Sequence, residues 1–266
     1  MNAFICVYRH PIPNNADIKR TIKIADKKKP VVQTFLADYS KDGCFYDWGD
    51  DPAFFSAKEY FGDWQHATWG VCRRDVRCQL SGGDLVIYFC GKQRSANLKL
   101  WDYYFIGFGV VNDLISREQI WRDNRYKIYR DFLNVLAKSE NGVLVQYEFF
   151  GKGHQDWHKR ITAPYVIFDQ QRTDFNLDNP LHVATKLEDS PIERWNSDNN
   201  KLVKRLEKSL FIDFGITRRL RTQSEQHAHR HIPIHAYIPK DKQTKQLQGL
   251  QNVLSEIACS VRNVEK

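Results

Sequence analysis

Tryptophans flank the apolar stretches that we expect to form strands, and their side chains suit stacking on a nucleobase. A large aromatic plane stacks on a base with roughly 1–3 kcal/mol, which is enough to hold a base that has been flipped out of a helix. The alternative is that each tryptophan simply belongs to the core. The tryptophans that we predict to line a base pocket are Trp48, Trp64, Trp69 and Trp101.

Arginines follow the third of these tryptophans closely. A guanidinium group suits both phosphate oxygens and base edges. If Arg73 and Arg74 lie on a strand, their side chains alternate, and at most one of them points into a pocket. We predict base contact for Arg73 and phosphate contact for Arg74. Further arginines predicted to bind phosphate are Arg77, Arg218, Arg219 and Arg221.

Histidines gather near the C-terminal third of the chain. In an extended segment His227, His229 and His231 would share one face, where they could bind a divalent cation. Neighbouring arginines would repel that cation, so we favour a segment that faces a polyanion. We therefore predict no bound metal and no other cofactor, with these three histidines as the weak metal candidates.

An enzyme is the main alternative function. Asp47 and Asp51 beside Trp48 could form the acidic site of a metal-dependent nuclease or of a base or nucleotide hydrolase. His154 or His158 could then supply a general base. No spacing in the chain matches a phosphate-binding loop, a nucleophile elbow or a zinc-deaminase signature. This alternative therefore rests on residue types and not on an arrangement.

The bulk properties favour a polyanionic partner. The formal net charge is +8, aromatic residues make up 13% of the chain, and seven of them are Trp. Cations neutralise phosphates while aromatic planes stack on bases. The six cysteines lack the spacing of a zinc ribbon or a disulfide framework, and no apolar run is long enough to span a bilayer. We expect a reduced, cytoplasmic protein with no signal peptide and no membrane partner.

Three apolar segments are predicted to form strands that would position these side chains. Residues 4–8, 85–89 and 103–111 are rich in β-branched and aromatic residues, and a Gly-Gly-Asp turn precedes the second of them. In the third segment, Gly107 and Gly109 fall on one face. A strand that lacks two side chains on one face either bends or lets a flat group approach its backbone.

Helices are predicted after these strands. Ser116 and Gln119 have the spacing of a capping box. A helix should follow, broken near Asp123 and continued over residues 126–137, with Asn141-Gly142 ending it. Residues 143–150 should then form a strand, by their composition and alternation. The last two helices are predicted over residues 201–211, capped by Asp198, and from Asp241 or Thr244 to Val261.

The economical description is a single α+β domain with a helical extension. We expect residues 1–180 to form the main domain, with an aromatic-rich insertion at about 11–69. Such aromatic density argues against disorder in the insertion. Residues 181–266 should form C-terminal helices that pack on the same domain.

Several motifs of this chain resemble those of the second type of nucleotide-modification-associated domain. The later segment from Tyr165 to Pro180 is also similar to that family. More broadly, the turn and its two strands resemble the PUA-like superfamily. The motifs that carry the resemblance are Gly70-Val71-Cys72, the basic stretch 73–77, Gly83-Asp84, the strand 104–111 and Trp121-Arg122-Asp123.

This resemblance implies a PUA-like small mixed β-barrel that holds a base or a nucleotide. It implies a protein that recognises a modified nucleobase in DNA, within a pathway of DNA modification or of defence against modified phage DNA. DNA is favoured over RNA, and a free nucleotide stays open as the ligand. A third interpretation is an interaction module whose charge only keeps it soluble. The oligomeric state is left open.

Overall fold

The described residues form a mixed α+β structure that divides into two compact units. Unit 1 comprises Met1–Ile12, Gly83–Val110 and Arg172–Lys266, and unit 2 comprises Pro13–Gly82 and Val111–Gln171. These bounds differ from the expected division at residue 180. The computed structural model describes residues 1–9, 53–55, 66–70, 73–95, 100–131, 135, 137–146, 157–175, 180–187, 195, 200–217, 220 and 231–263.

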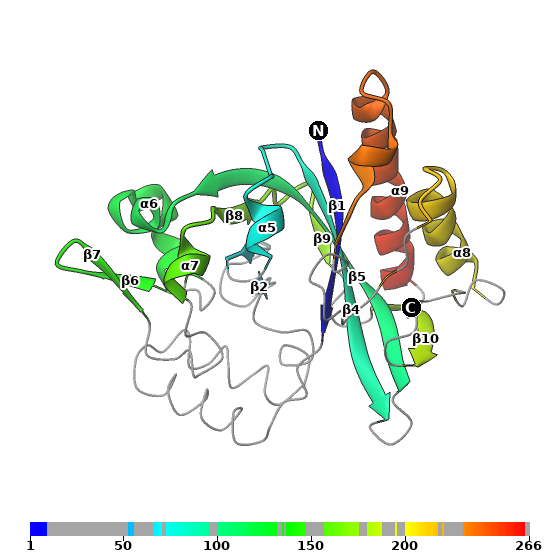
Figure 1. The fold of residues 1–266 in the computed structure, drawn as a ribbon, viewed down its shortest axis with the longest axis horizontal. Coiled ribbons are helices and arrows are strands. Elements are labelled where there is room, and N and C mark those ends of the chain that lie inside the picture. Colours follow the sequence, from blue (N-terminus) through cyan, green and yellow to red (C-terminus); the bar gives the residue numbers. More distant parts are fainter. Residues whose placement is uncertain are drawn as a thin grey trace. The chain divides into compact units, whose positions relative to one another are not determined.

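Unit 1 contains a mixed sheet (Figure 1). Strand β1 runs parallel to β4, and the other pairs in this unit are antiparallel. In sheet order the main strands are β11 (His231–Pro233), β1 (Ala3–Arg9), β4 (Leu85–Ser95) and β5 (Leu100–Ile115). Two further strands, β9 (Asp174–Phe175) and β10 (Leu181–Leu187), pair with different stretches of β5. The predicted turn before β4 is present, with Gly83 at a φ of 83°.

One face of this sheet packs against C-terminal helices. Alternate strand residues such as Ile5 and Ile87 share a core with the helices, as the two-residue period of a strand requires. The predicted stripe on the last helix is confirmed, since Leu247, Leu254 and Val261 are buried in that core. The helical elements are α8 (Lys201–Glu207), η5 (Lys208–Ile212), η7 (Ile234–Tyr237) and α9 (Gln243–Asn263). The cap of α8 is Asn200 and not Asp198, because the Asn200 side chain accepts from the N–H groups of the first turn.

Replacing Gly249 by alanine is expected to raise the free energy of unfolding by about 0.5–1 kcal/mol. Gly249 lies inside α9 at an exposed position, and a Cβ added there meets no atom within 4 Å. Alanine restricts the unfolded chain and favours the helix without a steric cost. Urea unfolding followed by circular dichroism checks this, and a lower midpoint for Gly249→Ala would contradict it.

Unit 2 contains an antiparallel arrangement of short strands. The last residues of β5 pair with β8 (Tyr165–Phe168), β8 pairs with β3 (His66–Trp69), and β3 pairs with β2 (Ala53–Phe55). Two short helices, α5 (Arg74–Arg77) and α7 (Trp157–Ile161), also belong to this unit. Arg73 and Arg74 therefore lie at the start of a helix, so the alternation of side chains along a strand does not apply to them.

The segment after β5 follows the sequence expectation only at its start. Helix α6 (Arg117–Arg122) opens with the predicted capping box at Ser116, and it ends at the predicted break. The continuation is a 3₁₀ helix, η1 (Asn124–Asp131), and not an α-helix. A hairpin then follows, formed by β6 (Ala137–Glu140) and β7 (Val143–Gln146). Asn141 and Gly142 form its turn at φ angles of 52° and 80°, so they join two strands and do not end a helix.

The expectation of an α+β fold with a C-terminal helix is confirmed. The mixed sheet does not close into a barrel among the strands that the structure describes. Within that same part of the chain, no helix combines the length and the apolar character needed to cross a membrane.

Candidate nucleic-acid interface

The predicted tryptophans that the structure describes are both buried. Trp69 and Trp101 expose none of their surface, and Trp101 lies in the core of unit 1. A side chain without exposed surface cannot stack on a bound base unless the fold rearranges. Trp48 and Trp64 lie outside the described residues.

The predicted pair Arg73 and Arg74 lies at the start of α5. Arg73 adopts the left-handed conformation at a φ of 53°, and its Nη2 lies 2.9 Å from a carboxylate oxygen of Asp75. Arg74 is exposed, and its Nε donates to the hydroxyl of Thr162 at 3.3 Å. Arg74 therefore lies at the surface, as a phosphate contact requires, while most of the Arg73 side chain is covered.

Arg77 has a structural position. Its side chain is fully buried, and the guanidinium donates to the backbone carbonyls of Arg160 at 3.1 Å, Ala163 at 3.3 Å and Pro164. A phosphate contact would require Arg77 to leave these carbonyls. In this position Arg77 does not reach the surface, as the predicted phosphate contact would require.

A second buried arginine, Arg117, converges on the same part of the backbone. It donates to the carbonyls of Val135 at 3.2 Å, Ala163 at 2.9 Å and Gly70, and it lies 5.0 Å from the ring centre of Tyr165. The Ala163 carbonyl thus accepts from Arg117 and from Arg77. The two guanidinium groups fix the connection between α7 and β8.

The other predicted site residues contribute little to a described site. His158 is exposed on α7, and His231 is half-buried in β11 with its ring 6.4 Å from that of Phe4. Among the described residues, no group of three or more His, Cys, Asp and Glu side chains could hold a metal ion. The remaining candidates lie outside the described residues: Asp47, Asp51, His154, Arg218, Arg219, Arg221, His227 and His229.

Gly107 is approached by the protein's own chain. Its φ is 135°, and an added Cβ would overlap the carbonyl oxygen of Asp174 and lie 2.7 Å from Cα of Phe175. The Phe175 ring also lies 5.8 Å from that of Tyr88. The sequence predicts that this strand either bends or lets a flat group approach its backbone, and in the structure β9 lies against Gly107.

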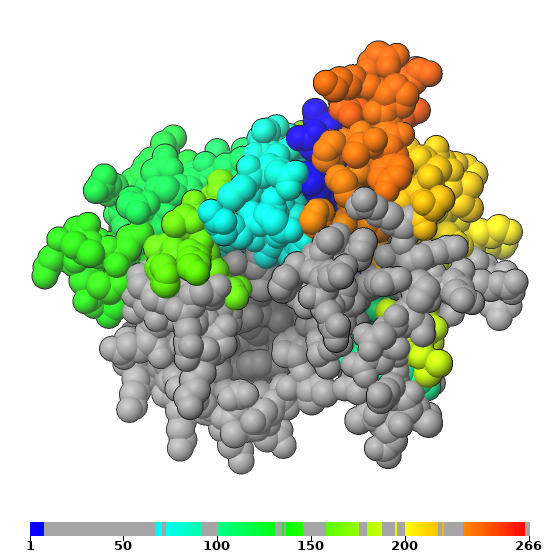
Figure 2. Space-filling model, viewed as in Figure 1, coloured from blue at the N-terminus to red at the C-terminus, as the bar shows by residue number. Residues whose placement is uncertain are grey.

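Three exposed cations of unit 2 lie close together in the sequence, in residues 121–127, which we call the basic segment. It spans the end of α6 and the start of η1, and its cations Arg122, Arg125 and Lys127 are all exposed. Trp121 and Tyr126 lie between them and are half-buried. Residues of α6 and η1 form part of the green surface in the space-filling view (Figure 2).

Two of these cations have no partner within the described part of the chain. The side chains of Arg122 and Lys127 make neither a hydrogen bond nor an ion pair there. The segment carries three cations against the single carboxylate of Asp123. Unpaired, exposed cations can neutralise phosphates without first breaking an ion pair of the protein.

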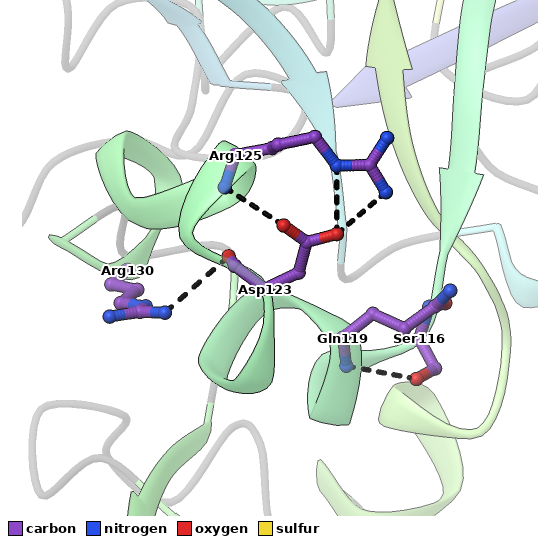
Figure 3. A network of polar contacts seen from close by, with 5 residues as sticks. All are labelled: Ser116, Gln119, Asp123, Arg125 and Arg130. Carbon is purple, nitrogen blue, oxygen red and sulfur yellow. Dashed lines mark hydrogen bonds and ion pairs between the residues drawn. The ribbon is translucent and has the colours of Figure 1, made fainter.

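Arg125 is held by Asp123 (Figure 3). One carboxylate oxygen of Asp123 accepts from the backbone N–H of Arg125 at 2.9 Å, and the other accepts from Nε at 2.9 Å and from Nη2 at 2.6 Å. These hydrogen bonds lower the pKa of Asp123 and raise the pKa of Arg125. The guanidinium carbon lies 5.4 Å from the ring centre of Tyr126, whose pKa is raised by burial.

Arg130 anchors the segment from η1. It donates to the carbonyls of Ile120 at 2.8 Å and Trp121 at 2.7 Å, and more weakly to that of Asp123 at 3.4 Å (Figure 3). A cation that donates hydrogen bonds to the last carbonyls of a helix stabilises its C-terminal end. The indole N–H of Trp121 donates to the Ala137 carbonyl at 3.1 Å. The segment is therefore fixed at its backbone while three cations point into solvent.

Such an arrangement has the residue types that can bind a phosphate-rich ligand. The cations can neutralise phosphates, and the partly exposed aromatic rings beside them can stack on bases. Sequence reasoning included Trp121-Arg122-Asp123 in a resemblance but gave no role to Arg125, Tyr126 or Lys127. The signal that could have found them is the alternation of aromatic and cationic residues over 121–130.

Comparison of the chain with protein-family models, with curated proteins and with solved structures found no match. The resemblance to a nucleotide-modification-associated domain therefore stays a prediction.

Proposed function

We propose that the protein binds nucleic acid through the basic segment, and that its target is DNA carrying a modified nucleobase. The observation that supports the first part is the exposure of Arg122, Arg125 and Lys127 beside Trp121 and Tyr126 on a fixed backbone. The net charge of +8 adds a favourable long-range field for a polyanion.

The preference for a modified base rests on the sequence motifs alone. A PUA-like barrel stays part of this proposal, and the parallel β1–β4 pair beside the antiparallel β4–β5 pair is compatible with it. Phosphate contacts would supply affinity, while contacts to base edges would supply specificity. None of the described residues favours the enzyme alternative by its geometry.

Replacing Arg122 and Lys127 together by alanine is expected to weaken DNA binding by a similar factor for all sequences. The slope of log K against log salt is negative, and each lost phosphate contact makes it less steep by about 0.9. The slope of the double variant should therefore be less steep than the wild-type slope by about 1.8. Fluorescence anisotropy with labelled duplexes, at several salt concentrations, measures both quantities. Duplexes with plain cytosine, 5-methylcytosine or 5-hydroxymethylcytosine test the base preference in the same assay.

The matched control removes two lysines from unit 1. Lys240 lies before α9 and Lys245 lies in its first turn. Both are exposed, and their side chains make no hydrogen bond or ion pair within the described residues. The Lys240→Ala/Lys245→Ala variant has the same net charge as the test variant and should keep the wild-type slope. Equal losses in the two variants would show that net charge and not the basic segment drives binding. The absence of binding to any duplex at low salt would contradict the proposed function.

A further inference from the structure

Arg125 engages only one edge of its guanidinium group. Nε and Nη2 donate to the same carboxylate oxygen of Asp123. Nη1 makes no hydrogen bond within the described part of the chain, and the side chain is 79% exposed. A guanidinium group has five N–H donors. The edge formed by Nη1 and the second N–H of Nη2 is therefore open to solvent.

The direction of this open edge is fixed in three ways. Asp123 holds the opposite edge through two hydrogen bonds, and it also accepts from the backbone N–H of Arg125. The ring of Tyr126 lies beside the guanidinium carbon. A donor pair that is already oriented loses less conformational entropy on binding than a free arginine does.

We propose that Arg125 donates through its open edge to a pair of acceptor atoms on the bound nucleic acid. This inference rests on the proposed function, because it assigns the ligand chemistry of the same segment. Two parallel N–H donors match the O6 and N7 atoms of guanine or two oxygens of one phosphate group. Asp123 is a positioning residue, since it acts through Arg125.

The charge of the pair separates Arg125 from its neighbours. Asp123 and Arg125 together carry no net charge, whereas Arg122 and Lys127 are unpaired cations. Arg125 therefore adds little to the salt-dependent attraction and acts through its geometry. Lysine in its place keeps the charge but cannot donate from a planar edge.

The test compares Arg125→Lys with Arg122→Lys, which makes the same exchange three residues earlier. Binding is measured by anisotropy on short duplexes that contain guanine, on the same duplexes with 7-deazaguanine, and on duplexes with methylphosphonate linkages. We expect Arg125→Lys to lose roughly tenfold in affinity and Arg122→Lys less than twofold. The wild-type preference for guanine over 7-deazaguanine, or for phosphate over methylphosphonate, identifies the acceptor pair, and Arg125→Lys should abolish that preference.

Asp123→Asn tests the positioning role. Asp123→Asn should reduce the same acceptor preference that Arg125→Lys abolishes. It should also increase the affinity for DNA at low salt, because the charge of Arg125 is no longer neutralised. If Asp123 had only a structural role, Asp123→Asn would lower the thermal midpoint of unfolding. We expect that midpoint to stay unchanged, because the pair is exposed.

Equal losses in Arg125→Lys and Arg122→Lys, with neither preference altered, would overturn the inference and leave the proposed function intact. A wild-type protein that binds none of the duplexes would overturn both.

Discussion

Replacing Arg117 by alanine is expected to lower the free energy of unfolding by about 3–5 kcal/mol. Its guanidinium group is fully buried and donates to the carbonyls of Gly70, Val135 and Ala163. Alanine removes this donor from all three buried carbonyls, of which that of Ala163 keeps its hydrogen bond from Arg77. Each buried acceptor that is left unsatisfied costs about 1–3 kcal/mol. The substitution also creates a cavity beside the ring of Tyr165.

Urea unfolding measures the total effect, and hydrogen exchange shows where it acts. Peptides from residues 111–131 and 157–171 in unit 2 should lose protection in Arg117→Ala. Peptides from α9 in unit 1 provide the internal comparison. The exchange pattern is needed because a chain with two units does not have to unfold in one step.

Two variants control this prediction. Arg122→Ala changes an exposed arginine on the same helix and should alter stability by no more than about 0.5 kcal/mol. Arg117→Lys keeps the charge, but one ammonium group cannot replace a planar group that bonds three separate carbonyls. It should therefore remain clearly destabilised. An Arg117→Ala protein as stable as Arg122→Ala would show that the three hydrogen bonds do not hold unit 2 together.

Periodicity predicted the last helix, and composition predicted the central strands of unit 1. The stripe from Leu247 to Val261 indicated α9, while the β-branched and aromatic residues of 4–8 and 85–89 indicated β1 and β4. In α9 burial repeats with the helical period, so the sequence carries the signal many times. In β1 and β4 consecutive residues 3–7 and 85–90 are all buried, so the signal there is an apolar run. The capping box at Ser116 was equally readable, because it depends on two residues at a fixed spacing.

Of the hairpin β6–β7, the sequence predicted a strand from Val143 but missed β6, because a local signal was assigned to the wrong element. Asn141-Gly142 was interpreted as the end of a helix, although this dipeptide also favours a two-residue hairpin turn. Residues 126–137 have apolar side chains at helical spacing, and this pattern favoured the end of a helix over a hairpin turn at Asn141-Gly142. The structure instead places a 3₁₀ helix and a strand there.

The roles of the arginines could not be predicted from their spacing. Arg74 and Arg77 both belong to a four-residue helix, which is too short to show a periodic face. Arg74 is exposed, whereas Arg77 is buried because the carbonyls of Ala163 and Pro164 lie within its reach. Those carbonyls are more than eighty residues away in the chain. Only the tertiary fold separates a buried, structural arginine from one that is free to bind phosphate.

Replacing Gly107 by alanine is expected to lower the free energy of unfolding by about 3–5 kcal/mol, the second large effect. Two costs combine at this position. The φ of 135° is a conformation that residues with a Cβ rarely adopt, and the added Cβ would meet backbone atoms of Asp174 and Phe175. Backbone atoms cannot rotate away as the end of a side chain can. Relief therefore requires β9 to separate from β5.

Gly83→Ala is the matched control for the backbone conformation. Gly83 also belongs to unit 1 and has a positive φ of 83°, but an added Cβ meets no atom within 4 Å. It should cost only about 1 kcal/mol. Urea unfolding of the two variants thus separates the cost of the φ angle from the cost of the overlap with β9. Equal costs would mean that β9 does not pack firmly against Gly107.

The variants Gly107→Ala and Gly83→Ala also distinguish two reasons for a glycine at position 107: the approach of a nucleobase or the packing of β9. If a nucleobase approached this strand, Gly107→Ala would abolish DNA binding while the protein stayed as stable as Gly83→Ala. If β9 fills the place, as the structure has it, Gly107→Ala loses stability first. Its remaining folded fraction should then bind DNA with the wild-type affinity, because the basic segment belongs to unit 2 and Gly107 to unit 1. Anisotropy measured well below the unfolding midpoint distinguishes the two results.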